Sequence, residues 1–125
     1  MKIRKMKFVD LQFVNKKFFF GKGINVASLK SNYIYVAEDK KEIKGILFAD
    51  VTKTGTAILF AIEVLKEYRK RGIAKKMMKR FEKDILKNGT NSIMVFYNKL
   101  EGIEPFYEKL NYEIGTNLKV ALKIV

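Results

Sequence analysis

The most constraining feature of this sequence is a strand–helix–strand pattern in its second half. Residues 56–65 (TAILFAIEVL) form an apolar run of strand length, and residues 92–97 (SIMVFY) form another. Between them, apolar side chains recur at the i, i+3, i+4, i+7 and i+11 spacing of one buried helix face. These side chains are Ala74, Met77, Met78, Phe81 and Ile85. The pattern predicts a β-α-β crossover within a mixed sheet.

The limits of this helix can also be read from the sequence. It is expected to begin near Gly72, where a cationic turn ends. It is expected to end at Asn88 and Gly89, because both residue types are common at helix C-termini. Lys87 would then lie in the last turn, where the helix dipole favours a cation.

The remaining elements follow from alternation and turn signals. Strands are expected at 2–5, 33–38 and 43–51, a helix at 10–19, a short helix near 103–110, and closing strands between 112 and 125. The three strands between residues 33 and 65 read as an antiparallel meander whose last member is central and buried. Phe18, Phe19 and Phe20 are expected to enter the core, with lining of a pocket as the alternative. The order predicts one α/β (α+β) domain over residues 1–125, with a mixed, mostly antiparallel central sheet flanked by helices.

Composition excludes several kinds of chemistry. The 125 residues include no cysteine and no histidine, which excludes disulfides, thiolate or histidine metal sites, and Ser-His-Asp or Cys-His catalysis. Any acid or base must be Asp, Glu, Lys, Tyr or a chain terminus, and no metal is expected. No apolar run is long enough to cross a bilayer, and the start lacks a signal-peptide stretch, so a cytoplasmic protein is expected.

Positive charge is the other strong bias of the sequence. There are 26 basic and 13 acidic residues, which gives a formal net charge of +13 and favours anionic partners. Only four of the basic residues are Arg, whereas readers of nucleic acid rely on Arg for contacts to guanine. This argues against nucleic acid as the partner, although a small basic nucleic-acid-binding protein stays as an alternative.

The cations gather where the long helix should begin. Residues 66–87 hold ten basic and three acidic residues. Cations are unfavourable at the positive end of a helix unless an anion is bound there. Free backbone N–H groups at a helix N-terminus bind phosphate, and Gly72 leaves room for one to approach. The stretch EYRKRGIAKK (67–76) therefore predicts a pyrophosphate site, with a solvated Lys-rich helix as the alternative.

Two segments resemble the GNAT superfamily of acyl-CoA N-acyltransferases. VLKEYRKRGIAKKMM (64–78) is similar to motif A of that family, and PFYEKLNY (105–112) to its later FYEKLGF signature. The resemblance implies a GNAT-like fold and acetyl-CoA as the cofactor. It implies that the pantetheine arm pairs like an added strand with the end of residues 56–65, and that N–H groups of residues 70–75 hold the pyrophosphate. The implied cofactor-binding residues are Ile62, Glu63, Val64, Arg69, Lys70, Arg71, Gly72, Ile73, Ala74, Lys75 and Asn98.

The resemblance also implies catalytic roles. Tyr107 would protonate the leaving CoA thiolate, for which a phenol with a pKa of about 10 is suited. Glu63 is the candidate general base, because it is the acidic residue in the third strand's apolar run; a salt bridge to a lysine is its alternative role. Glu38 and Asp50 are further candidates, and water could relay the proton instead. Because cysteine is absent, the amine would attack the thioester directly, with an N–H near Val64 stabilising the oxyanion.

The sequence departs from the family pattern in places. Asn111 replaces the Gly of the FYEKLGF signature, which is a mild change because Asn tolerates left-handed backbone angles. The stretch between Asn98 and Tyr107 is longer than usual, and the chain before residue 33 is short where family members build part of the acceptor pocket.

These observations together predict an acetyl-CoA-dependent N-acetyltransferase that acts by direct attack in a ternary complex. The expected acceptor is a primary amine on a small molecule, protein or peptide, and no membrane partner is expected. A homodimer through the last strands is open. Beside the nucleic-acid alternative, a catalytically weak CoA-binding interaction module is the second rival.

Overall fold

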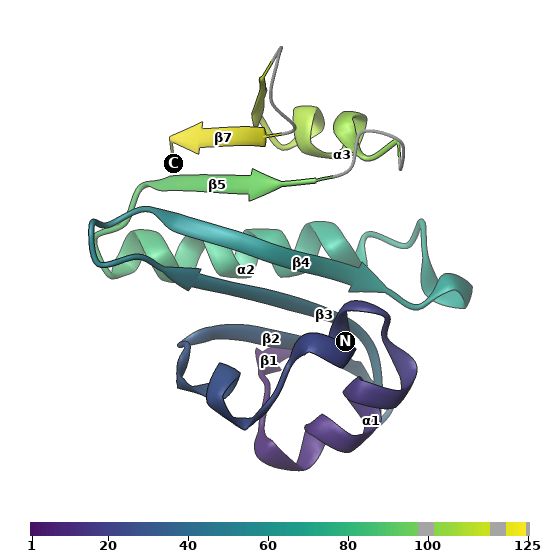
Figure 1. Cartoon of the computed structure of the whole chain (residues 1–125). Helices are drawn as coiled ribbons and strands as arrows, with labels where there is room; N and C mark the ends of the chain where they lie inside the picture. Colours follow the sequence, from purple (N-terminus) through teal and green to yellow (C-terminus); the bar gives the residue numbers. More distant parts are fainter. Residues whose placement is uncertain (98–101, 116–119, 125) are drawn as a thin grey trace.

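A single seven-stranded sheet organises the computed structural model, which describes residues 1–97, 102–115 and 120–124 (Figure 1). Its strand order is β1-β2-β3-β4-β5-β7-β6. The strands are β1 (Lys2–Lys5), β2 (Tyr33–Asp39), β3 (Glu42–Val51), β4 (Ala57–Val64), β5 (Ser92–Phe96), β6 (Glu113–Ile114) and β7 (Val120–Ile124). The described pairs are antiparallel except for β4 with β5, which are parallel. The predicted mixed, mostly antiparallel sheet with a central β4 is confirmed.

Helices cover both faces of the sheet. They are α1 (Leu11–Lys17), α2 (Ile73–Lys87) and α3 (Glu104–Lys109), with 3₁₀ turns at Phe8–Asp10, Phe20–Gly23, Val26–Lys30 and Lys66–Tyr68. Alternate residues of β2 serve the two faces: Tyr35 belongs to the core beneath α2, whereas Ile34 and Val36 belong to the core beneath α1. Figure 1 shows α1 in front of β1–β3 and α2 behind the sheet. In the described residues, no helix is long and apolar enough to cross a membrane.

Helix α2 has the limits and the buried face that the sequence predicts. Met77, Met78, Phe81 and Ile85 are fully buried. Gly72 precedes the helix with φ +79°, and Asn88 follows it, with Gly89 at φ +88°. The Thr90 N–H donates to the Ile85 carbonyl at 2.9 Å, as expected where a left-handed residue ends a helix. As the β-α-β pattern predicts, α2 connects two parallel strands.

The end of α1 differs from the prediction. Phe18 is fully buried, but Phe19 is 65% exposed and Phe20 is 43% exposed, so the expectation that all three enter the core was wrong. The helix ends at Lys17, Phe18 is extended, and the chain then turns back on itself. Gly21 makes this turn possible, because a Cβ there would overlap the Val14 carbonyl. The close approach of Gly21 to α1 directs the rings of Phe19 and Phe20 outward.

Two carboxylates, one buried and one half-buried, fasten the turn before α1 and helix α2 to the sheet. Asp10 accepts bonds from both terminal nitrogens of Arg4, at 2.8 and 3.0 Å. Asp84, on α2, accepts from Tyr35 Oη at 2.7 Å and from Arg80 Nε at 2.9 Å. Burial raises the pKa of each carboxyl, but these donors and the neighbouring positive charge outweigh it, so both pKa values lie below their usual range.

Candidate active site

Strands β4 and β5 pair over only part of their length. The described pairs are Ala57↔Ile93, Ile58↔Met94 and Leu59↔Val95, after which β4 continues beside β3 and β5 continues beside β7. A bulge lies where the two strands part. Ala49 pairs with Leu59 and Phe48 with Ala61, which leaves Phe60 as the extra residue. A bulge bends its strand and increases its twist, so it favours divergence here.

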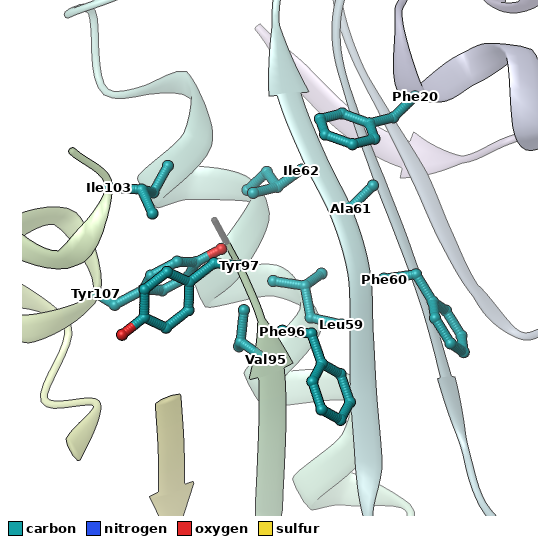
Figure 2. Close-up of a pocket in the computed structure, with 10 residues that line it drawn as sticks. All are labelled: Phe20, Leu59, Phe60, Ala61, Ile62, Val95, Phe96, Tyr97, Ile103 and Tyr107. Atoms are coloured by element: carbon teal, nitrogen blue, oxygen red, sulfur yellow. The ribbon is translucent and has the colours of Figure 1, made fainter. Parts of the chain in front are cut away.

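A pocket of about 530 Å³ lies where the strands diverge (Figure 2). Its volume is in the range of about 300–1,000 Å³ that is usual for small-molecule sites. In Figure 2, β4 forms one wall, and α3 and the residue before it form the opposite wall. The lining side chains are apolar apart from two tyrosine hydroxyl groups. The lining residues are Phe20, Leu59, Phe60, Ala61, Ile62, Val95, Phe96, Tyr97, Ile103 and Tyr107.

Backbone groups at the end of β4 face this opening. The Leu65 N–H donates to the Lys44 carbonyl of β3 at 3.0 Å, and the Glu63 carbonyl also lies toward β3, near Gly45. Because backbone groups alternate in direction along a strand, those of Ile62 and Val64 turn toward the β5 side. An extended molecule could therefore pair with Ile62 and Val64 as a strand would, whereas the backbone of Glu63 serves β3.

The turn before α2 has an unusual backbone. Lys70 (φ 65°) and Gly72 (φ 79°) are both left-handed, a conformation that costs an L side chain roughly 1–2 kcal/mol. A Cβ on Gly72 would meet no atom within 4 Å, so the space beside it is open. The first described bond of the helix runs from Lys76 N–H to Gly72 O at 3.1 Å, so the N–H groups of Ile73, Ala74 and Lys75 point out of the helix start. This arrangement is suited to an anion.

Side chains around this turn support the same conclusion. Arg69 Nε donates to the Val64 carbonyl at 2.9 Å and so ties the turn to the end of β4. Lys70, Arg71, Lys75 and Lys76 are exposed. None of these four cations belongs to an ion pair among the described residues. The positive charge at the helix start is thus not neutralised by protein carboxylates there.

Two tyrosines bring hydroxyl groups to the pocket. Tyr107, on α3, is buried, and its ring lies 6.0 Å from that of Tyr97 and 5.5 Å from that of Tyr112. Figure 2 shows it entering from the wall opposite β4. Tyr97 Oη donates to Glu104 at 2.6 Å, and this bond raises the pKa of Tyr97 to about 12. Tyr107 therefore lies where a proton donor to the pocket is needed, and its role stays a prediction.

The side chain of Glu63 turns to the chain segment after α1. Its two carboxylate oxygens accept the N–H groups of Phe19 at 3.0 Å and Phe20 at 2.9 Å. The carboxylate therefore holds the Phe20–Gly23 turn against β4. Its partners are backbone groups and not the lysine considered from the sequence. A role for Glu63 as general base stays a prediction.

The other candidate bases, Glu38 and Asp50, lie away from the pocket. Glu38 accepts from Arg4 at 3.3 and 3.4 Å, and Asp50 accepts from the Val51 N–H at 2.9 Å. Neither carboxylate lines the pocket. Asn98 lies outside the described residues. Sequence reasoning missed Phe60, Phe96 and Tyr97 as lining residues, because they stand in apolar runs where burial is the ordinary expectation.

Comparison with known proteins identifies the family. The family model described as an acetyltransferase (GNAT) domain matches residues 30–114. No curated protein sequence matches significantly.

Solved structures of similar proteins agree with this fold. Ard1 from Thermoplasma volcanium superposes with a TM-score of 0.84 at 14% identity, over 99% of this chain and 97% of that one. The PaiA N-acetyltransferase from Thermoplasma acidophilum, in complex with coenzyme A, gives 0.80 at 15% identity, over 99% and 98%. Arabidopsis thaliana Naa50, in complex with the bisubstrate analogue CoA-Ac-MVNAL, gives 0.77 at 15% identity, over 99% and 98%. At such identities the likeness concerns the fold.

Proposed function

The chain belongs to the GNAT acetyltransferase family, and we propose that it transfers an acetyl group from acetyl-CoA to a primary amine. One observation carries the proposal. The pocket between the diverging strands lies at the same end of β4 as the cationic turn that begins α2. Acetyl-CoA carries its thioester and its pyrophosphate on one flexible chain. It therefore needs a pocket for the thioester and a cationic site for the pyrophosphate at the same end of a strand. Similar proteins solved with coenzyme A or a CoA conjugate support the choice of cofactor.

The residues that would hold acetyl-CoA are those around β4 and the start of α2. Ile62 would pair with an amide group of the pantetheine arm, and Val64, whose carbonyl accepts from Arg69, would contact the arm at its thioester end through its N–H. The N–H groups of residues 70–75 would bind the pyrophosphate, with Lys70, Arg71 and Lys75 close to its charge. Arg69 would act by holding the turn to Val64. When bound, acetyl-CoA supplies the activated thioester.

The transfer itself needs few protein groups. The amine nitrogen attacks the thioester carbonyl carbon, a C–N bond forms, and the C–S bond breaks. The Val64 N–H would stabilise the oxyanion of the intermediate, and Tyr107 would give its proton to the leaving thiolate. The surplus proton of the amine would pass to Glu63 or to water. No acyl-cysteine can form, since the chain has no cysteine.

Calorimetric titration of acetyl-CoA tests the cofactor site. Micromolar binding is expected, and Gly72→Glu should abolish it by placing a carboxylate where the phosphates lie. Gly55→Glu is the matched control, because Gly55 also has positive φ (92°) and open space around it, but lies in the turn between β3 and β4. Binding of a short RNA at the same ionic strength, with none of acetyl-CoA, would instead favour the nucleic-acid alternative.

A second candidate function is CoA binding without turnover. The observation that favours it is the engagement of Glu63, whose two oxygens already accept backbone N–H groups. Release of free thiol from acetyl-CoA, measured with and without a panel of amines, distinguishes the two functions. Amine-dependent release above the hydrolysis rate excludes the binding module.

A further inference from the structure

Three exposed phenylalanines surround the opening of the pocket. Phe20 is 43% exposed, Phe60 is 51% exposed, and Phe96 is 57% exposed. They come from the turn after α1, from the bulge of β4 and from the end of β5 (Figure 2). The Phe60 ring lies 5.1 Å from that of Phe48, which packs against the core beneath α1. Aromatic rings that stay exposed together at a cavity are typical of a binding surface.

The described lining of the pocket also lacks charge. None of its ten lining residues carries a charged side chain. Within the described part of the chain, Glu63 accepts the N–H groups of Phe19 and Phe20, and Glu104 accepts from Tyr97 Oη at 2.6 Å, so both of these carboxylates are engaged. An ammonium ion that entered would lose water without gaining a free carboxylate from the described residues, which is costly. The net charge of +13 opposes its approach as well.

We propose that the pocket selects a primary amine of low basicity with an apolar group beside the nitrogen. This is the chemistry of an α-amine on a large apolar residue, either in a free derivative or at the start of a peptide. The inference rests on the proposed acetyl transfer and names the acceptor class for the same site. It excludes the lysine side chain and the polyamines as preferred acceptors.

The preference follows from the state in which the amine must react. Only the neutral amine has the lone pair that attacks the thioester. An α-amine has an ordinary pKa of about 7.7–8.0 and a lysine side chain of about 10.4, so near neutral pH their neutral fractions differ on the order of a hundredfold. An apolar pocket makes this difference count, because desolvation favours the neutral form, so each amine must lose its proton to bind, and that loss costs more for the stronger base. The phenylalanine rings then bind the neighbouring side chain.

Glu63 would act here as a positioning residue. Its bonds to the N–H groups of Phe19 and Phe20 fix the backbone from which the Phe20 ring reaches the opening. The segment is 43 residues away from Glu63 in sequence, so no local interaction replaces this contact.

A panel of four acceptors tests the proposal on the full chain. Phenylalaninamide and a tripeptide amide beginning with Phe carry the proposed chemistry from its two sources. Glycinamide keeps the α-amine but lacks the apolar group, and Nα-acetyl-lysinamide offers only the ε-amine. We expect kcat/KM for phenylalaninamide to exceed that for glycinamide about tenfold or more, the usual effect of an apolar group in a fitting pocket. The ε-amine should be the poorest acceptor, and equal or better use of it overturns the proposal.

Variants connect the preference to the phenylalanines. Phe20→Ala and Phe60→Ala should each reduce the phenylalaninamide-to-glycinamide ratio several-fold, mainly through KM. Phe8→Ala is the control, because Phe8 is also an exposed phenylalanine but lies outside the pocket. Phe60→Glu, which adds a carboxylate at the opening, should raise relative use of the ε-amine. Unchanged ratios in all three pocket variants contradict the proposal.

The acetyl-CoA titration separates this inference from the function on which it depends. If a pocket variant binds acetyl-CoA with the original Kd, the fold and cofactor site are intact, and a changed acceptor ratio reports on the acceptor alone. If acetyl-CoA binds and only basic amines are acetylated, the acceptor class is wrong and the transferase function stands. If acetyl-CoA does not bind, both proposals fail.

Discussion

At the scale of single residues, the pocket offers two hydroxyl groups whose chemistry differs. Tyr97 donates to Glu104, and that bond together with burial raises its pKa to about 12, so it gives up a proton less readily than an ordinary phenol. Tyr107 stands at the position that the family resemblance assigns to the acid. Their rings are only 6.0 Å apart. Removal of the hydroxyl group from either tyrosine can therefore be compared in the same packing environment.

Replacing Tyr107 by Phe should remove the proton donor and keep the ring contacts. We expect acetyl-CoA to bind unchanged and kcat to fall about 10²-fold or more, the usual contribution of a general acid. Steady-state kinetics and calorimetry measure the two quantities. Tyr33→Phe is the control, since it also removes a hydroxyl from a buried tyrosine, one that accepts a bond from Asn88 at 2.9 Å. An unchanged kcat in Tyr107→Phe would exclude Tyr107 as the acid.

Glu63→Gln separates the two roles of that side chain. A glutamine oxygen can accept one N–H, but its NH₂ group cannot accept the other, so one backbone donor loses its partner. We expect the free energy of unfolding to fall by about 1–2 kcal/mol and KM for the amine to rise, with kcat little changed. A large loss of kcat, together with loss of the acidic limb of the pH–rate profile, would show instead that Glu63 is the base.

At the scale of secondary-structure elements, the turn after α1 depends on one close backbone contact. A Cβ on Gly21 would overlap the Val14 carbonyl and lie 2.8 Å from a Val14 methyl group. We expect Gly21→Ala to lower the free energy of unfolding by about 1–3 kcal/mol through overpacking. Gly23→Ala should have little effect, because its Cβ would meet no atom within 4 Å. Urea denaturation of both variants is the measurement, and equal stabilities would contradict this account of the turn.

The attachment of α2 to the sheet should make stability depend on pH. Burial raises the pKa of Asp84, but the bonds from Tyr35 and Arg80 lower it by more than burial raises it. The pKa of Asp84 therefore lies below its usual value. The folded state then binds fewer protons than the unfolded state below about pH 4, where an ordinary Asp titrates. The contribution of Asp84 is therefore present above that pH and is lost as pH falls through the folded pKa. Melting temperatures between pH 7 and 3 should fall less steeply in Asp84→Asn than in the unchanged protein.

Many of the secondary-structure elements could be predicted from the sequence. The limits of α2 follow from Gly72, from Asn88 and from a strict helical period, which are local signals. The fates of Phe19 and Phe20 could not be predicted, because three adjacent phenylalanines have the same hydrophobicity. Their exposure depends on the packing of Gly21 against α1 and on Glu63, which lies in a distant strand. Equally, no local pattern distinguishes the bulge at Phe60 from an ordinary buried strand position.

At the scale of the whole molecule, charge is distributed unevenly. The described ion pairs join β1 to β2 and α2 to β7, whereas the exposed cations at the start of α2 have no such partner among the described residues. The cationic end of the candidate site, where we propose that phosphate binds, could therefore be predicted from composition and order. The acceptor end could not, because it is assembled from the α1 turn, β4, β5 and α3.

Acetyl-CoA binding should consequently be sensitive to salt. The Debye length is about 10 Å at 0.1 M and about 3 Å at 1 M ionic strength, so added salt screens the exposed cations. We expect Kd to rise several-fold over this range, and Lys75→Glu to weaken binding roughly fivefold or more while reducing the salt dependence. Lys53→Glu, an equal change of charge in the exposed turn between β3 and β4, is the control. Equal effects of the two substitutions would show that only net charge matters.

The partial pairing of β4 with β5 has a consequence for the behaviour of the protein in a crowded solution. The last residues of β4 form an edge inside a sheet, and free edges are templates for aggregation. Here that edge runs between the Phe20 side of the pocket and the wall made by Ile103 and Tyr107. A slender molecule can reach it, whereas the strand of a neighbouring protein, with side chains on both faces, would meet those walls. The same enclosure that leaves room for a slender ligand would thus hinder pairing of two copies of the chain through the end of β4.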